Sequence, residues 1–205
     1  MKTTFIQTVS GRRVSLPIPE LDQIDIEDIA ISLSQKCRFN GHTHRGAIPT
    51  FYSVAEHCVR VSRLVRLELA LAALLDDGSE AYLCDMPRPV KDLLPDYKDL
   101  ELSVQSQIEK KFGIFLNDKE RAEIKKADNI MLANEGVALM GDIKGWGLAE
   151  QPILSFLVPY SIEESRRWFL REFKKLTLLK NHKTKFADLP SASIGVDQTD
   201  IEELS

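Results

Sequence analysis

The sequence predicts an all-α domain that carries a small β-hairpin at its N-terminus. Apolar residues recur at helical spacing in most segments after residue 25, and capping residues precede several of these segments. Alternation typical of strands is confined to residues 3–18. The 205 residues suffice for one sizeable core and do not require two. We therefore expect one domain over residues 1–180 and a polar, mobile tail over residues 181–205.

The hairpin and the first helix are placed by local signals. Ser10-Gly11-Arg12-Arg13 lies between two short alternating runs and suits a turn between strands. Asp25 can cap a helix, because its carboxylate can accept from the first backbone N–H groups. The apolar residues after it follow a helical period: Ile26, Ile29, Ala30 and Leu33. This helix is expected to end near Cys37.

A polar loop is expected over residues 38–52. It contains two glycines, a proline, two histidines and two arginines, so it favours contact with a ligand over a simple connection. A merely solvated loop is the alternative. Ser53 and Glu56 then have the spacing of a capping box. The helix that they open places His57 on or near its buried face and continues through Val65.

Four carboxylates follow an apolar helix expected over residues 67–75. Asp76 and Asp77 come at its C-terminal end, where the helix dipole disfavours negative charge, and Glu80 and Asp85 follow. Unpaired carboxylates beside a buried helix are costly, so we expect a cation there, either a metal ion or basic side chains. An ordinary acidic helix end that leads into a loop is the alternative.

Three later helices complete the prediction. One covers about 97–112 and is closed by a glycine, and a longer one covers about 117–139. Within the longer helix Lys125 and Asp128 are three residues apart, so both can face one site. A second capping box at residues 161–164 opens the final helix.

The composition limits the class of partner. The chain is 43% hydrophobic and 28% charged with a net charge of -4, which is typical of a soluble globular protein. It lacks the basic excess of a duplex-binding protein, so a small anionic ligand is favoured and nucleic acid is not. No apolar run approaches the roughly 20 residues that cross a bilayer, and the N-terminus is too polar for a secretory signal. We therefore expect a cytoplasmic protein without a membrane partner.

Three segments resemble the HD-domain phosphohydrolases. They read RFNGHT…FYSVAEHCVRVS, LLDDGSEAYLCDMPRPVKDLLPDYK and EIKKADNIMLANE, and they occur in the order of that family. The resemblance runs from about residue 5 to 178 and is greatest to a small bacterial and prophage branch. That branch includes 5'-deoxynucleotidases and phage deoxynucleoside triphosphohydrolases. The resemblance implies an HD-domain helical bundle that forms a homo-oligomer.

The resemblance also implies a divalent metal ion held by His57, by the pair Asp76 and Asp77, and by Asp128. The chain departs from the family at Asp76, where the family has a second histidine. The exchange adds a negative charge and an oxygen donor, which favours magnesium or manganese over cobalt or zinc. Two alternatives stay open: the shorter side chain does not reach the metal and the site is weak or empty, or the residue was changed to trap a substrate.

Further roles follow from the same resemblance. Glu80 would be the general acid or base near the leaving oxygen, with Asp77 as its catalytic partner. The substrate-binding residues would be Arg38, Lys91 and Lys125 at the phosphate, Asp85 at the sugar 3'-hydroxyl, and Phe39 and His42 over the base or sugar. Solvated surface lysines, and an arginine that simply compensates Asp77, are the alternatives.

The expected function is removal of the 5'-phosphate from a 2'-deoxyribonucleoside monophosphate by metal-activated water. Two alternatives stay open. Hydrolysis of a deoxynucleoside triphosphate such as dATP, in phage or prophage control of the nucleotide pool, would use the same metal and the same cations. A nucleotide-binding module without turnover would follow if Asp76 had abolished the reaction.

Overall fold

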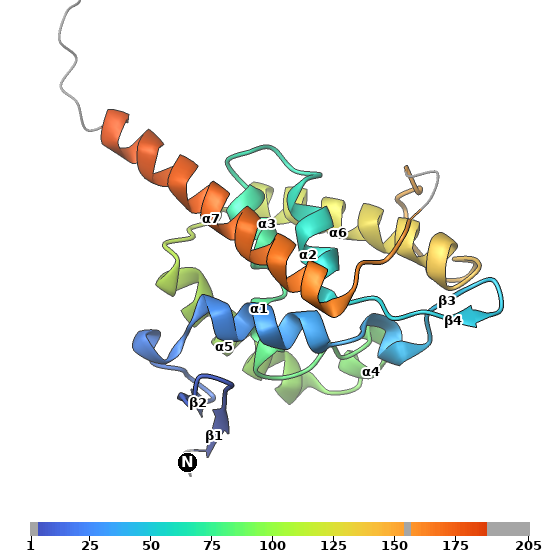
Figure 1. Ribbon diagram of the computed structural model, residues 1–205, viewed down its shortest axis with the longest axis horizontal. Coiled ribbons are helices and arrows are strands. Elements are labelled where there is room, and N and C mark those ends of the chain that lie inside the picture. Colours follow the sequence, from blue (N-terminus) through green and yellow to red (C-terminus); the bar gives the residue numbers. More distant parts are fainter. Residues whose placement is uncertain (1–3, 154–156, 188–205) are drawn as a thin grey trace, which may run out of the picture.

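The computed structural model describes residues 4–153 and 157–187. Within these residues the protein is mostly helical, with helices packed around one apolar core and a two-stranded hairpin near the N-terminus (Figure 1). The predicted helical class and the predicted hairpin are thereby confirmed. None of the described helices combines the length and the apolar character that a membrane span requires.

The hairpin pairs β1 (Thr4–Gln7) with β2 (Arg13–Leu16) in antiparallel register. The chain reverses between the strands through a turn in which Gly11 has a φ of +84°, a conformation that glycine adopts without strain. Asp28 accepts hydrogen bonds from the hydroxyls of Thr8 and Ser10, at 2.7 and 2.6 Å. These bonds fasten the turn of the hairpin to the first helix.

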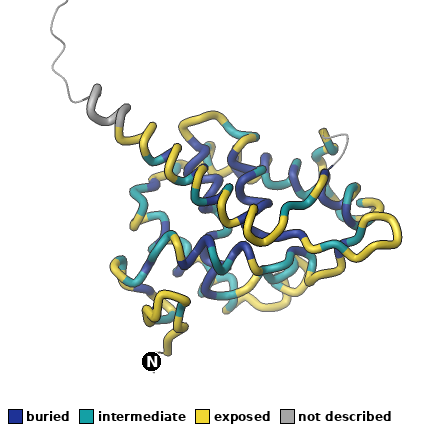
Figure 2. The backbone as a smooth tube through the Cα atoms, in the orientation of Figure 1, coloured by how far each residue is buried: buried dark blue, intermediate teal, exposed yellow. Residues whose placement is uncertain are grey.

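Two helices form the centre of the core. After a 3₁₀ turn at Leu21–Gln23, α1 (Ile26–Gln35) begins behind Asp25, whose side chain accepts from the N–H of Glu27 as the sequence predicts. Later in the chain, α2 (Val54–Ser62) contacts α1, α3, α6 and α7. Nearly every residue of α2 is buried, and its course is dark along most of its length in Figure 2.

The start of α2 departs from the prediction in one respect. The hydroxyl of Ser53 accepts from the N–H of Glu56, which is the expected cap. The carboxylate of Glu56 turns away to Arg60 and to the N–H of Tyr160 and does not complete the capping box. The helix also ends at Ser62, earlier than predicted, and Val65 lies in the turn that follows.

The loop between α1 and α2 has more structure than expected. It contains a 3₁₀ turn at Arg38–Gly41 and a small antiparallel pair, β3 (His44–Arg45) with β4 (Ile48–Pro49). Phe39 and Asn40 have φ values of 53° and 51°, which side chains other than glycine rarely adopt. The loop is therefore a defined unit beside the core.

The apolar run before the carboxylates is shorter as a helix than predicted. Only Ala70–Leu74 form α3, and Asp76 and Asp77 lie in the turn that leads into a 3₁₀ helix at Gly78–Ala81. The side chain of Gln105 brackets this turn, because it donates to the carbonyl of Leu75 at 2.7 Å and accepts from the N–H of Ser79 at 3.0 Å.

Three helices follow. The short α4 (Arg88–Lys91), which the sequence did not predict, is followed by α5 (Pro95–Lys111), which has a proline in its first turn as helix starts often do. The long α6 (Asp118–Leu139) begins behind Asn117, which forms a complete capping box with Glu120. The predicted extents of the two long helices are confirmed within two residues.

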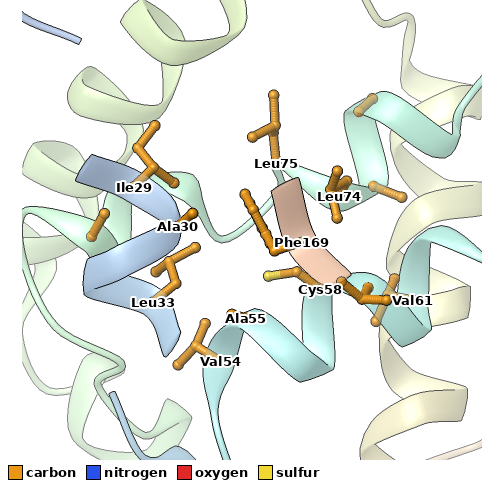
Figure 3. Packing of buried hydrophobic residues seen from close by; sticks show 14 of the residues in the cluster. Ile29, Ala30, Leu33, Val54, Ala55, Cys58, Val61, Leu74, Leu75 and Phe169 are labelled. Atoms are coloured by element: carbon orange, nitrogen blue, oxygen red, sulfur yellow. The ribbon is translucent and has the colours of Figure 1, made fainter. Parts of the chain in front are cut away.

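The last helix, α7 (Ile162–Ala187), begins with the predicted capping box between Ser161 and Glu164. It crosses α1, α2 and α3, and Phe169 lies fully buried among the side chains of those helices (Figure 3). It continues beyond residue 181, where the sequence predicted the tail to begin, and residues 188–205 of that predicted tail lie outside the described residues.

Candidate active site

His57 is the centre of the candidate site. It lies in the first turn of α2 and is 2% exposed. Its Nε2 atom lies 3.2 Å from Asp128 Oδ1 on α6 and 3.5 Å from Asp77 Oδ2 in the turn after α3. Its Nδ1 atom lies 2.6 Å from Glu135 Oε1. Three residues that the sequence assigned to one site therefore converge, although 71 positions separate the first from the last.

The imidazole is held as a cation by its neighbours. Burial disfavours the charged form and Arg38 repels it, but Glu135 and Asp128 outweigh both and raise the pKa of His57 to about 10. Its hydrogen bond and charge in turn hold the pKa of Asp128 well below its usual range, against the effect of burial. Lys125 forms an ion pair with the same carboxylate, as the three-residue spacing predicts.

The pKa values of the adjacent carboxylates Asp76 and Asp77 are raised, in contrast to that of Asp128. Burial, with repulsion from Asp77 and Asp128, raises the pKa of Asp76 to about 7. Burial also raises the pKa of Asp77, although His57 and Arg38 partly oppose it. This corner of the site therefore has more carboxylate charge than its basic side chains balance, which is the condition under which a further cation binds favourably.

Glu80 lies on the 3₁₀ helix behind these aspartates and is 5% exposed. Burial, followed by repulsion from Asp77 and Asp85, raises the pKa of Glu80 well above its usual range. Its Oε2 atom is buried and has no hydrogen-bond partner among the described residues. A buried carboxyl group with a raised pKa holds its proton to higher pH than usual, which is a property of a general acid.

Arg38 is a buried cation that contacts both Glu135 and Asp77. Its Nε atom donates to Glu135 Oε2 at 3.0 Å, and its Nη1 atom lies 3.9 Å from Asp77 Oδ2. The guanidinium lies over the ring of Phe39, which contacts Trp146 with a centroid separation of 5.8 Å. The arginine is therefore an ion-pair partner of Asp77, and its guanidinium also lies beside the ring of Phe39.

The remaining predicted residues are less central. Lys91 forms an ion pair with Glu101 of α5 at 2.6 Å, and Asp85 interacts with the site through charge, on Arg38 and Glu80. His42 is exposed and lines a surface hollow of about 300 Å³ formed by its own loop. Within the described part of the chain, no side-chain hydrogen bond or ion pair joins His42 to the carboxylate cluster.

Glu135 and Tyr52 were missed by the sequence reasoning. Both are 0% exposed, and the Tyr52 hydroxyl donates to Glu135 Oε1 at 2.8 Å. A signal for Glu135 is present in the sequence, because it lies seven residues after Asp128 and so on the same face of α6 two turns later. An acidic residue on a buried helical face requires a cationic partner, and Glu135 has two, His57 and Arg38.

The donor types of the site fit a divalent ion. Donors about 2.1 Å from one ion lie about 3.0 to 3.4 Å apart, similar to the 3.2 and 3.5 Å that separate His57 Nε2 from the two carboxylates. Glu135 supports the opposite ring nitrogen, as carboxylates do for metal-binding histidines. In the structure these groups contact one another as ion pairs, and no three of the described His, Cys, Asp and Glu residues are arranged to hold an ion. Binding would therefore require loss of the Nε2 proton and reorientation of the carboxylates.

The fold and this geometry define a helical protein with a buried histidine–carboxylate centre. No family model matches the chain. It is 46% identical to the uncharacterized protein YfdR of Escherichia coli K12 over 132 residues, which cover 64% of this chain and 70% of that protein. It is 34% identical to an uncharacterized protein of Rhodobacter capsulatus over 151 residues, covering 69% of this chain and 76% of that protein. The chain belongs to the family of YfdR.

Proposed function

We propose that the protein is a metal-dependent phosphohydrolase of the HD-domain type that removes the 5'-phosphate from 2'-deoxyribonucleoside monophosphates. The observation that carries the proposal is the position of His57 Nε2 between Asp77 and Asp128, with Arg38 beside the same aspartate. A histidine and two carboxylates next to an arginine are the groups needed to bind a divalent ion and a phosphate together. The resemblance of the three sequence segments supports the same assignment.

The ion would be held by His57, Asp77 and Asp128, with Asp76 adjacent. When bound, it would activate a water molecule and neutralise part of the negative charge on the phosphate oxygens. Phosphate binding and protonation of the leaving group are carried out by side chains of the protein. Arg38 binds phosphate oxygens through its outer nitrogens, because its Nε is already committed to Glu135. Lys125, which is largely exposed beside Asp128, adds a second positive charge at the mouth of the site.

Glu80 provides the proton for the leaving group. As water adds to phosphorus and the bond from phosphorus to the 5'-oxygen breaks, the buried carboxyl of Glu80 gives its proton to that oxygen and becomes a carboxylate. The raised pKa of Glu80 favours the protonated form that this step uses. The resulting carboxylate lies near Asp77 and Asp85, whose repulsion favours its reprotonation before the next turnover.

Product analysis tests the proposal directly. The protein is incubated with dAMP or with dATP under magnesium, manganese or cobalt, and the products are separated. We expect deoxyadenosine and phosphate from dAMP, and loss of this reaction in His57→Gln. Release of triphosphate from dATP alone would favour the triphosphohydrolase. Absence of any hydrolysis in every metal would favour the nucleotide-binding module.

Asp76→His tests the metal assignment. The substitution removes one carboxylate charge from the cluster and supplies the imidazole of the resembling family. We expect the affinity for cobalt to rise about tenfold or more relative to magnesium, because imidazole prefers the softer ion. Isothermal titration of both metals into the wild type and the variant measures this ratio, with Asp76→Asn as the uncharged control. No gain in metal affinity or in hydrolysis would contradict the metal assignment.

A further inference from the structure

Glu135 accepts hydrogen bonds from three side chains that lie far from it in the sequence. Its Oε1 atom accepts from His57 Nδ1 at 2.6 Å and from the Tyr52 hydroxyl at 2.8 Å, while Oε2 accepts from Arg38 Nε at 3.0 Å. The residue is 0% exposed and lies near the C-terminal end of α6, two turns after Asp128. One carboxylate therefore connects the histidine at the carboxylate cluster with the arginine beside it.

We propose that Glu135 is a positioning residue that fixes the imidazole of His57 and the guanidinium of Arg38 relative to each other. Its proposed task is to keep the metal-facing Nε2 and the phosphate-facing Nη groups directed at one substrate. This inference rests on the proposed function and deepens it, because it names the group that couples metal binding to phosphate binding.

The two contacts act on different atoms. The bond from Nδ1 to Oε1 fixes the ring orientation and the proton on Nδ1, so that Nε2 is the nitrogen that faces Asp77 and Asp128. The bond from Nε to Oε2 fixes the long arginine side chain and leaves its outer nitrogens on the side of Asp77. A shift of the carboxylate would consequently move both groups at once.

Glu135→Gln separates these two contacts. The amide oxygen is expected at the Oε1 position, because it then accepts from both His57 and Tyr52. The amide NH₂ then faces the N–H of Arg38, so that two donors oppose each other. We expect the affinity for Mn²⁺ to change by less than about threefold and the KM for dAMP to rise about tenfold or more, the effect of losing one charge-assisted hydrogen bond.

Glu135→Ala removes both contacts. We expect the affinity for Mn²⁺ to fall about 10- to 100-fold, the usual effect of losing the carboxylate behind a metal-binding histidine, together with a loss of kcat. Glu56→Gln is the matched control, since Glu56 is also 0% exposed and also binds an arginine. It should leave the affinity for Mn²⁺ and the KM for dAMP unchanged. Equal losses of metal and substrate affinity in Glu135→Gln, or the same pattern in Glu56→Gln, would overturn the inference.

A readout without metal separates this inference from the proposed function. The proton NMR signal of His57 Nδ1–H in metal-free protein, assigned with ¹⁵N-labelled histidine, is expected to persist in Glu135→Gln and to shift or exchange away in Glu135→Ala. An unchanged signal in Glu135→Ala overturns the positioning role. A wild-type protein that neither binds Mn²⁺ nor hydrolyses dAMP overturns the proposed function instead. Glu135→Gln keeps the side-chain size, so its Mn²⁺ affinity and its KM for dAMP test the inference even if the alanine variant does not fold.

Discussion

Two buried glutamates, Glu56 and Glu135, provide an internal comparison. Both are 0% exposed and both bind an arginine. Glu56 has Arg60 and the backbone N–H of Tyr160 as partners, and burial raises its pKa. Glu135 has two cations, Arg38 and His57, and the Tyr52 hydroxyl as partners. Arg38 above all, then His57 and the hydrogen bonds, lower its pKa although burial opposes the shift.

The difference shows that burial alone does not decide the state of a carboxylate. The network of Glu56 joins α2 to the backbone of residues 158–160, because Glu56 accepts from the N–H of Tyr160 and Arg60 donates to the carbonyl of Val158. The network of Glu135 connects only side chains, and one of these, His57, faces the carboxylate cluster. We therefore interpret the first network as structural and the second as part of the site.

The largest expected effect is a difference in folding stability between Arg60→Ala, beside Glu56, and Arg38→Ala, beside Glu135. Arg60→Ala leaves Glu56 buried with one backbone donor and should lower the free energy of unfolding by about 3 kcal/mol. Arg38→Ala leaves Glu135 with His57 and Tyr52, so we expect a loss of only about 1 to 2 kcal/mol. Urea unfolding measures both, with the exposed Arg166→Ala as control. An equal or greater loss in Arg38→Ala would contradict the comparison.

The next effect concerns the residue that follows Glu135. A Cβ atom on Gly136 would lie 2.3 Å from Ile143 Cγ2 and 2.9 Å from Trp146 Cζ3. Gly136→Ala must therefore displace the loop at residues 141–147, and we expect a net loss of about 1 to 2 kcal/mol despite the better helix propensity of alanine. Thermal unfolding measures the loss and Trp fluorescence the displacement. A raised Tm, as exposed helical glycines give, would show that the loop yields freely.

Asp76 extends the comparison to a carboxylate that, within the described residues, forms no direct ion pair with an arginine. Its folded pKa of about 7 lies above the ordinary value, so ionisation disfavours the folded state, increasingly as pH rises from about 4 to 7 and fully above that. Asp76→Asn should thus be neutral near pH 4 and should stabilise by about 1 to 2 kcal/mol at pH 8, since the side chain is partly exposed. Urea unfolding across this range checks it, with exposed Asp99→Asn as control. A gain that is independent of pH would exclude this cause.

The starts of several helices could be predicted from residues close together in the sequence. Helices begin behind Asp25, Ser53, Asn117 and Ser161, because a cap needs only its own side chain and the next three residues. Helix ends were predicted less well, since α2 stops at Ser62 and α7 passes residue 181. Those ends depend on packing against other elements, which the local pattern does not contain.

The site was predictable in part. The contacts of His57 with Asp77 and Asp128 agree with the expected convergence. Glu135 was missed because the prediction rested on motifs that supply metal ligands, and the pairing of Lys91 with Glu101 was missed because it joins two separate helices. The metal, the deoxynucleotide substrate, the homo-oligomer and the cytoplasmic location stay predictions, because each depends on partners outside the chain.

The course of α7 has a consequence for how the polypeptide folds during synthesis. Phe169 fills the space between α1, α2 and α3, and Lys180 donates to the carbonyls of Phe112 and Gly113 at the end of α5. The faces of α1, α2 and α3 that α7 covers therefore stay exposed until α7 has left the ribosome. The nascent protein is therefore prone to aggregation until α7 emerges and covers these faces.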